Sequence, residues 1–272
     1  MRQTSKCQMP KQKGIIKIHG KLNGKSYYPL NGVYISRMAN GPSKERIQTD
    51  PAFAHLKAKN QEFGMASRLS KAIRTGVLET VKEFQDSKMA SRLTGACYQI
   101  IQEGRGHIGK REAKLQNNPQ ALIGFQLNQK QTLNQIYAAT PVVTSHKNRR
   151  LITISIPKST ENHLIKRPKS ATHFQLTAAL SMVSNYTCRS DQKAYRPVAP
   201  KQNAVGITQK TEPLLCKIAH TNLQIQLKTP VKREVSTNVS LLVWFGIQFL
   251  KQEGHTYVSY KNMRVMQAIH LL

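Results

Sequence analysis

Residues 223–250, LQIQLKTPVKREVSTNVSLLVWFGIQFL, carry the two patterns that decide the fold. At the start of this stretch Leu223, Ile225 and Leu227 alternate with polar side chains, which places apolar and polar groups on opposite faces of a strand. Residues 239–250 are apolar almost throughout, yet the run is interrupted by polar residues and is too short to cross a bilayer as a helix. We interpret both runs as strands and expect no membrane span.

Similar short runs recur from residue 119 onward, many of them separated by Pro, Asn and charged residues. This spacing favours a β-sandwich, with a closed barrel as the alternative. The other runs are 121–128, 151–156, 174–186, 214–219 and 257–260. Residues 189–213, which contain three prolines, are expected to form a long loop or excursion.

The chain before Asn118 has a different pattern. Residues 11–37 form short alternating runs split by Gly20, Asn23-Gly24 and Asn31-Gly32, which predicts a small β-meander. Its expected apolar face consists of Ile16, Ile18, Leu22, Tyr28, Leu30, Val33 and Ile35, leaving Lys17, Lys21, Lys25 and Arg37 toward solvent.

Helical patterns follow the meander. Asp50-Pro51 is typical of a helix start, because Asp caps free amides and Pro is tolerated in the first turn. The helix that starts there has an apolar stripe of Phe53, Leu56, Phe63 and Ile73. Further helices are predicted at about 78–84 and 88–102. The predicted fold class is α+β, with a basic α/β region of meander and helices at 1–118 and a β-rich, sandwich-like domain at 119–272.

The charge of the chain is its strongest functional signal. There are 42 Lys and Arg against 13 Asp and Glu, a formal net charge of +29, and the first acidic residue is Glu45. A field of this sign attracts phosphate and releases its counterions, so RNA or DNA is the expected partner class. Lysines on exposed strand positions also protect a sheet edge against aggregation, and this alternative stays open.

Catalytic and metal-binding patterns are weak throughout. The four cysteines are dispersed, with no C-x-x-C pair and no neighbouring His, so neither a zinc site nor a disulfide framework is predicted. We find no G-x-S-x-G or H-E-x-x-H motif. No cofactor, no metal and no catalytic residue is expected, and the absence of a signal-like apolar region after the basic N-terminus favours a cytoplasmic protein.

Residues 104–110, GRGHIGK, match G-x-G-x-x-G and most of the G-x-x-x-x-G-K phosphate-loop pattern. A phosphate loop follows a strand, opens a helix and continues with Ser or Thr, whereas this segment follows a predicted helix and continues with Arg111. A basic loop is the better interpretation, and nucleotide binding is the weaker alternative.

Several motifs occur in a recognisable order: KGIIKIHG at 13–20, Tyr27-Tyr28, Asp50-Pro51-Ala52-Phe53, Glu62-Phe63-Gly64 and GFQLN at 124–128. In this the chain resembles a family of uncharacterised proteins found in Bacteroidota. The resemblance spans about the first two thirds of the chain and implies an N-terminal α/β region followed by a β-rich region. It implies no catalytic residue.

The preferred hypothesis is a non-enzymatic nucleic-acid-associated or structural interaction protein that contacts the phosphate backbone. A β-sandwich assembly component of a mobile element or large complex, with a protein partner, is the alternative. The predicted nucleic-acid-binding residues are Lys11, Lys13, Lys17, Lys21, Lys25, Lys57, Arg68, Lys71, Arg74, Arg105, Lys110 and Arg111.

Overall fold

The computed structural model describes residues 10–38, 41–188 and 194–272. Its contacts divide the chain into two compact units, Met1–Lys57 and Ala58–Leu272. This division differs from the expected one at 118/119, because the helices after Lys57 bury their apolar faces against the C-terminal sheet.

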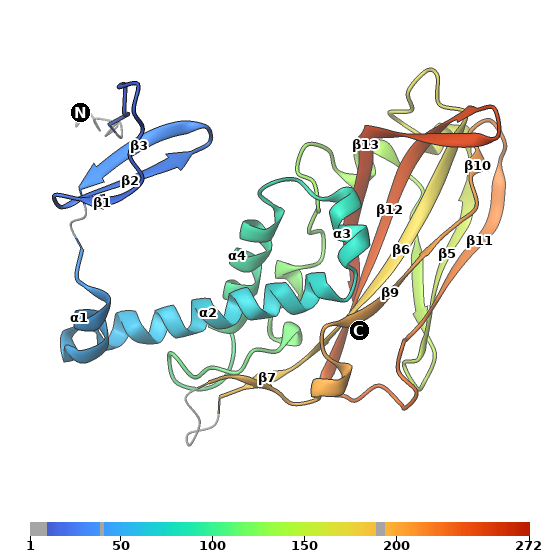
Figure 1. Cartoon of the computed structure of the whole chain (residues 1–272). Helices are drawn as coiled ribbons and strands as arrows, with labels where there is room; N and C mark the ends of the chain where they lie inside the picture. The colour runs from blue at the N-terminus through green and yellow to red at the C-terminus, as the bar shows by residue number, and fades with distance from the viewer. Residues whose placement is uncertain (1–9, 39–40, 189–193) are drawn as a thin grey trace, which may run out of the picture. The chain divides into compact units, whose positions relative to one another are not determined.

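The first unit contains a three-stranded antiparallel sheet (Figure 1). Its strands are β1 (Gly20–Leu22), β2 (Lys25–Leu30) and β3 (Val33–Met38), followed by α1 (Lys44–Thr49) and the short helix η1 (Pro51–Phe53). The two hairpin turns, Asn23-Gly24 and Asn31-Gly32, have positive φ at all four residues, as the favoured two-residue hairpins require. The meander is therefore confirmed.

The expected apolar face of this sheet is wrong. Ile35 is the one buried large apolar residue among the described residues of the unit, whereas Ile16 is 84% exposed and Leu22 is 51% exposed. Residues 12–19 form no strand, and Lys11 makes only an isolated bridge to Ile35. A three-stranded sheet by itself has too little surface to bury a whole face.

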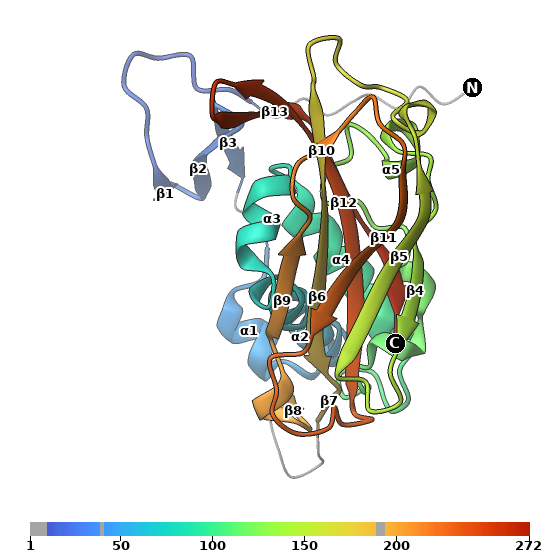
Figure 2. The same cartoon turned by 90° about the vertical axis from the view of Figure 1, so that its right-hand side faces the viewer.

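The second unit contains three layers (Figures 1 and 2). The helical layer consists of the greater part of α2 (Ala54–Thr75), α3 (Leu78–Phe84) and α4 (Met89–Gln102). The central antiparallel sheet has the order β10-β6-β12-β13, and β9 also pairs with β6. The third layer is the antiparallel sheet β11-β5-β4.

The bounds of four strands, β5, β6, β11 and β12, follow the apolar runs of the sequence closely. The central sheet comprises β6 (His173–Ser184), β9 (Val205–Lys210), β10 (Leu214–Leu215), β12 (Val239–Glu253) and β13 (Thr256–Leu271). The outer sheet comprises β4 (Val142–Ser145), β5 (Leu151–Ser159) and β11 (His220–Lys228). The remaining elements are β7 (Tyr186–Thr187), β8 (Arg196–Pro197), α5 (Leu133–Ile136) and the short helices η2 (Leu115–Asn117), η3 (Pro119–Ala121), η4 (Glu161–His163) and η5 (Pro200–Gln202).

Two cores explain why β6 and β12 are apolar almost throughout. Trp244 faces the helices and packs in one core, while Phe245 beside it faces the outer sheet and packs in the other. A strand covered on both faces has no alternation of apolar and polar residues. Strand β11 keeps this alternation because one of its faces is exposed. The α+β class and the sandwich-like arrangement of two sheets are confirmed.

Some elements differ from the sequence expectation. Residues 121–128 form turns rather than a strand, although Leu127 N–H still donates to the Met266 carbonyl at the edge of β13. The expected loop at 189–213 contains β9, while residues 189–193 lie outside the described residues. The predicted stripe on α2 is right only at Ile73, which is buried with Met65, Ala66 and Leu69, whereas Leu56 and Phe63 are exposed.

Candidate nucleic-acid interface

The predicted N-terminal lysines divide between the two faces of the sheet and its neighbouring loop. Lys21 pairs in register with Ser26, whereas Lys25 pairs with Leu22 one position away, so their side chains leave opposite faces. The Lys17 ammonium donates to the carbonyls of Gln12 (2.8 Å) and Gly14 (2.5 Å). Lys17 therefore closes its own loop, while Lys11, Lys13, Lys21 and Lys25 are exposed.

The four predicted cations of α2 also differ in availability. Lys57 donates to the Gln48 carbonyl (3.2 Å), and the Arg74 Nε donates to the Ser70 carbonyl (3.3 Å). Arg68 and Lys71 are exposed, and with Tyr186, Tyr195 and Asn203 they line a shallow hollow of about 410 Å³. Both tyrosines are buried, at 7% and 6% exposure, so this hollow offers cations without an open aromatic face.

A further hollow of about 680 Å³ lies beside η5. Its cations, Lys201, Lys232 and Arg233, make no ion pair among the described residues and were not singled out from the sequence. The sequence gives little sign that these cations lie together, because Lys201 is 31 residues away from Lys232.

The Gly-rich segment 104–110 is held by a buried carboxylate. Glu62 on α2 is 1% exposed and accepts a hydrogen bond from the Gly109 amide (2.8 Å). Gly109 has φ +89° and lies against Ala58, where a side chain would clash. The amide that a phosphate loop would offer to an anion is thus occupied by the protein's own carboxylate.

The cations of this segment are split between solvent and Glu62. Arg105 and Lys110 are exposed, while Arg111 is half-buried with its Nε 3.8 Å from the Glu62 carboxylate. The segment follows α4, and no helix opens directly after it. This geometry favours the basic-loop interpretation of 104–110 over a nucleotide site.

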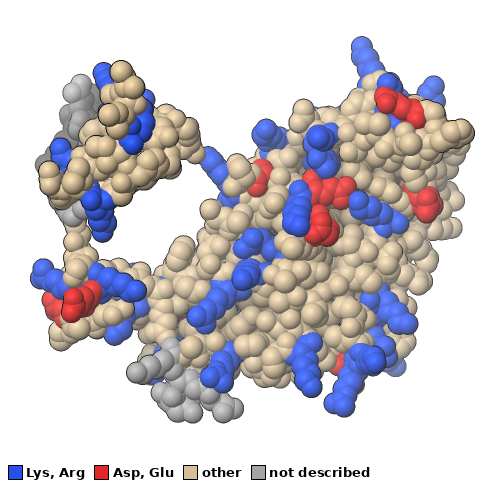
Figure 3. Space-filling model, in the orientation of Figure 1, with Lys and Arg blue, Asp and Glu red and all other residues tan. Residues whose placement is uncertain are grey.

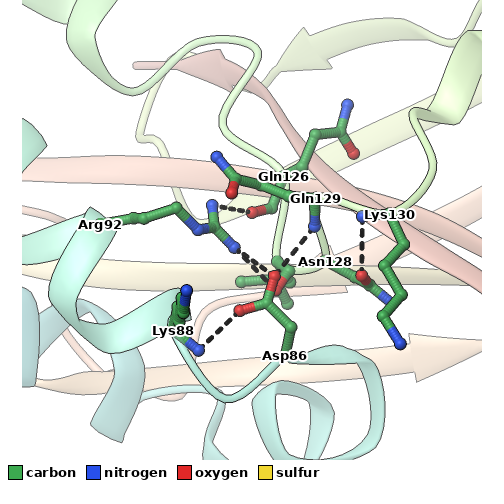
Figure 4. Close-up of polar contacts among 8 residues, drawn as sticks. Asp86, Lys88, Arg92, Gln126, Asn128, Gln129 and Lys130 are labelled. Carbon is green, nitrogen blue, oxygen red and sulfur yellow. Dashed lines mark hydrogen bonds and ion pairs between the residues drawn. The ribbon is translucent and has the colours of Figure 1, made fainter.

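A second polar centre, which is half-buried, joins the start of α4 to the turn after residue 123 (Figure 4). Asp86 accepts hydrogen bonds from the amides of Lys88 (2.8 Å) and Gln129 (2.9 Å) and from the Arg92 guanidinium (2.8 Å). Arg92 also donates to the Gln126 carbonyl (2.9 Å). Every partner shown in Figure 4 is internal, so this centre fastens two segments to each other.

The electrostatics of this centre agree with a fixed carboxylate. Burial raises the pKa of Asp86, but the amides of Gln129 and Lys88 and the charge of Arg92 outweigh burial, so the pKa lies below its ordinary value. The Arg92 guanidinium also lies 5.1 Å from the centroid of the Phe125 ring. Sequence reasoning missed both Glu62 and Asp86. The partners of Glu62, Gly109 and Arg111, lie more than 40 positions away, and so does the Gln129 amide that ties Asp86 to the turn at 124–129.

Basic side chains outnumber acidic ones on the protein surface. Figure 3 shows Lys and Arg scattered over the visible face, most of which is neither basic nor acidic, with Asp and Glu in a few places. Eight Lys or Arg side chains of the described residues form ion pairs. Arg149 is used internally as well, since its guanidinium donates to the carbonyls of Ser236, Val239 and Leu272. Lys17, Lys57 and Arg74 donate to carbonyls in the same way. Most of the other cations of the described residues are left to meet an external anion.

The described residues contain no group of three or more His, Cys, Asp or Glu side chains arranged to hold a metal ion. None of the helices in that part of the chain is long and apolar enough to cross a membrane. Comparison with protein-family models and with curated proteins gives no match to this chain.

Proposed function

We propose that this protein binds nucleic acid through the phosphate backbone and acts as a non-enzymatic structural interaction protein in the cytoplasm. One observation carries the proposal. The described residues 10–38 include six Lys or Arg and no Asp or Glu, and they belong to a folded sheet with its adjoining loop. Cations without local carboxylates keep their attraction for phosphate and release counterions when they bind it.

The test is the salt dependence of binding to mixed-sequence RNA and DNA, measured by fluorescence anisotropy. The variant replaces Lys11, Lys13, Lys21 and Lys25 by Gln and keeps Lys17, because Lys17 holds its own loop together. Each lost phosphate contact should reduce the slope of log K against log salt by about 0.7–0.9, so the loss of all four should reduce it by up to about 3.6.

A matched control removes the same charge elsewhere. Four exposed lysines of the second unit, none of them in an ion pair of the described residues, are replaced by Gln: Lys130, Lys147, Lys158 and Lys228. We expect this control to change the slope by less than half as much. Equal losses in both variants would show that the attraction is spread over the whole surface and would reject the N-terminal site.

Protein assembly is the second candidate function, and exposed apolar residues on sheet edges favour it. Tyr257 and Val258 near the start of β13 are 44% and 49% exposed, and Val142 on the edge strand β4 is 48% exposed. Open edges of this kind can pair with a strand of another chain. An oligomer that persists in light scattering after nuclease treatment supports assembly, whereas a nuclease-sensitive particle supports the nucleic-acid proposal.

The resemblance to the Bacteroidota family is a proposal about kinship alone. It adds no partner and no activity to either candidate function.

A further inference from the structure

The register of the N-terminal sheet assigns each side chain to one of two faces. Tyr28 pairs with Ile35, while its neighbour Tyr27 pairs with Ser36 and Gly20. Because directly paired residues share a face and successive residues alternate, the two tyrosines point in opposite directions. The face that holds Tyr28, called here the Tyr28 face, carries Lys11, Lys21, Ser26, Tyr28, Ile35 and Arg37.

The Tyr28 face contains a cationic hollow. Lys21, Ser26, Tyr28 and Arg37 line a cavity of about 480 Å³, which lies in the size range of small-ligand sites. No Asp or Glu lines it, and neither cation takes part in an ion pair among the described residues. Tyr28 is half-buried and lines the cavity, so part of it is accessible.

One of the two tyrosines on the opposite face, Tyr34, is already covered. The Tyr34 ring meets His19 edge-on at 5.3 Å between ring centroids, and the Lys17 ammonium lies 5.8 Å from the same ring. Lys17 in turn donates to carbonyls of its own loop. On the opposite face Tyr34 and Lys17 are thus used in internal packing, while Tyr27 is half-buried and Lys25 is exposed. The Tyr28 face is distinguished by its hollow, which brings Lys21 and Arg37 to the same cavity as Tyr28.

We propose that the Tyr28 face binds single-stranded nucleic acid, with one base stacked on Tyr28 and neighbouring phosphates on Lys21, Arg37 and Lys11. An unpaired base offers its ring face to an aromatic side chain, and stacking tolerates any base. Bases in a duplex are stacked on each other and cannot reach this ring. The inference rests on the proposed function and narrows it from nucleic acid in general to single strands.

The test compares variants of the two adjacent tyrosines. Tyr28→Leu keeps apolar bulk against Ile35 but cannot stack, and Tyr27→Leu is the matched change on the other face. Affinity for a labelled 12-nucleotide single strand of mixed sequence, as DNA and as RNA, is measured by anisotropy beside the corresponding duplex. Circular dichroism melting of each variant confirms that it is folded, and Tyr28→Phe retains the ring if the Leu variant is unfolded.

We expect Tyr28→Leu to weaken single-strand binding by about 5- to 150-fold, the range for the loss of one base–aromatic stack. Tyr27→Leu and Tyr28→Phe should change it by less than threefold, and duplex binding should be unaffected by all three. Lys21→Gln should weaken binding more than Lys25→Gln, because Lys25 lies on the other face.

Three results would overturn the inference. Equal single-strand affinities for the two Leu variants would exclude stacking on Tyr28 while leaving the proposed nucleic-acid function intact. Equal losses for single strand and duplex would exclude single-strand selectivity. A wild-type protein that binds neither form, or that binds heparin as tightly as the single strand, would reject the proposed function together with this inference.

Discussion

Glu62 is a carboxylate placed in the interior of a protein that carries few carboxylates. It accepts the Gly109 amide at 2.8 Å and lies 3.8 Å from the Arg111 Nε, while Tyr195 O–H donates to the Gly109 carbonyl at 3.4 Å. Burial and the charge of Glu62 both raise the pKa of Tyr195, so its hydroxyl stays a donor. Glu62 thus holds the Gly-rich segment through a backbone amide and a cation.

Replacing Glu62 tests this function. Glu62→Ala leaves the Gly109 amide and the Arg111 guanidinium without their partner, so the free energy of unfolding should fall by about 2–4 kcal/mol in urea titrations. Glu62→Gln keeps an acceptor oxygen and should cost about 1–2 kcal/mol. Trypsin should cut at Arg105, Lys110 or Arg111 faster in the Ala variant.

The control is Glu79→Gln, because the Glu79 side chain is 84% exposed and forms an ion pair with Lys82 on the same helix. Its effect should stay below about 0.5 kcal/mol. An unchanged unfolding free energy and an unchanged cleavage rate in Glu62→Ala would show that the segment is held by other contacts.

At the level of elements, Asp86 makes the junction of α4 with the turn at 124–129 sensitive to pH. A carboxyl group whose pKa is lower in the folded than in the unfolded chain stabilises the fold above its unfolded value, about 3.9 for Asp. That contribution is lost as the pH falls through the folded pKa. Asp86→Asn should therefore reduce the unfolding free energy by about 1–3 kcal/mol at pH 7, and the deficit should shrink below about pH 4.

The measurement is the difference between wild type and Asp86→Asn in urea unfolding at pH 7, 5 and 3.5. Using the difference cancels the titration of the other carboxylates. Arg92→Lys is a companion variant, since Lys cannot reach Asp86 and the Gln126 carbonyl with a planar fork. A deficit that is the same at all three pH values would contradict the role assigned to the Asp86 charge.

The elements that sequence patterns predicted are those whose burial matches a regular period. Leu223, Ile225 and Leu227 alternate because β11 has one exposed face, and Met89, Leu93 and Ile100 on α4 repeat because that helix has one buried face. Residues 121–128 are mostly apolar because they pack against the helices. This composition predicts a strand, but the backbone of the segment forms turns.

The candidate site could be predicted only in part. Composition identifies the cations of residues 10–38, but only the strand register shows that Lys21 and Lys25 leave opposite faces. Tertiary contacts determine which cations are already used, as for Lys17, Arg74 and Arg111. Glu62 carries no local signal, because a buried carboxylate is recognised by partners that the fold brings to it. Asp86 has near partners in Lys88 and Arg92, but its contact with the Gln129 amide depends on the fold.

At the scale of the whole molecule, like charges oppose the compact state. The net charge is +29 on 272 residues, and the attraction within eight ion pairs of the described residues acts against the resulting repulsion. Exposed ion pairs contribute little each, whereas repulsion acts between all uncompensated cations. Added salt screens both, since the Debye length is about 10 Å at 0.1 M, and the net effect should be stabilising.

The nucleic-acid-free protein should therefore melt at a higher temperature in 0.5 M than in 0.02 M KCl, by about 2–8 °C in circular dichroism, since about 1 kcal/mol shifts a chain of this size by about 2–4 °C. A variant that combines the two Lys→Gln sets has eight fewer positive charges, and the salt-induced rise should be smaller. Preferential binding of chloride would raise the melting temperatures of the wild type and of this variant equally. Equal rises would therefore contradict the repulsion argument. A melting temperature that fell with salt would mean that the ion pairs outweigh the repulsion, and that the excess of cations is tolerated without the polyanion it is proposed to meet.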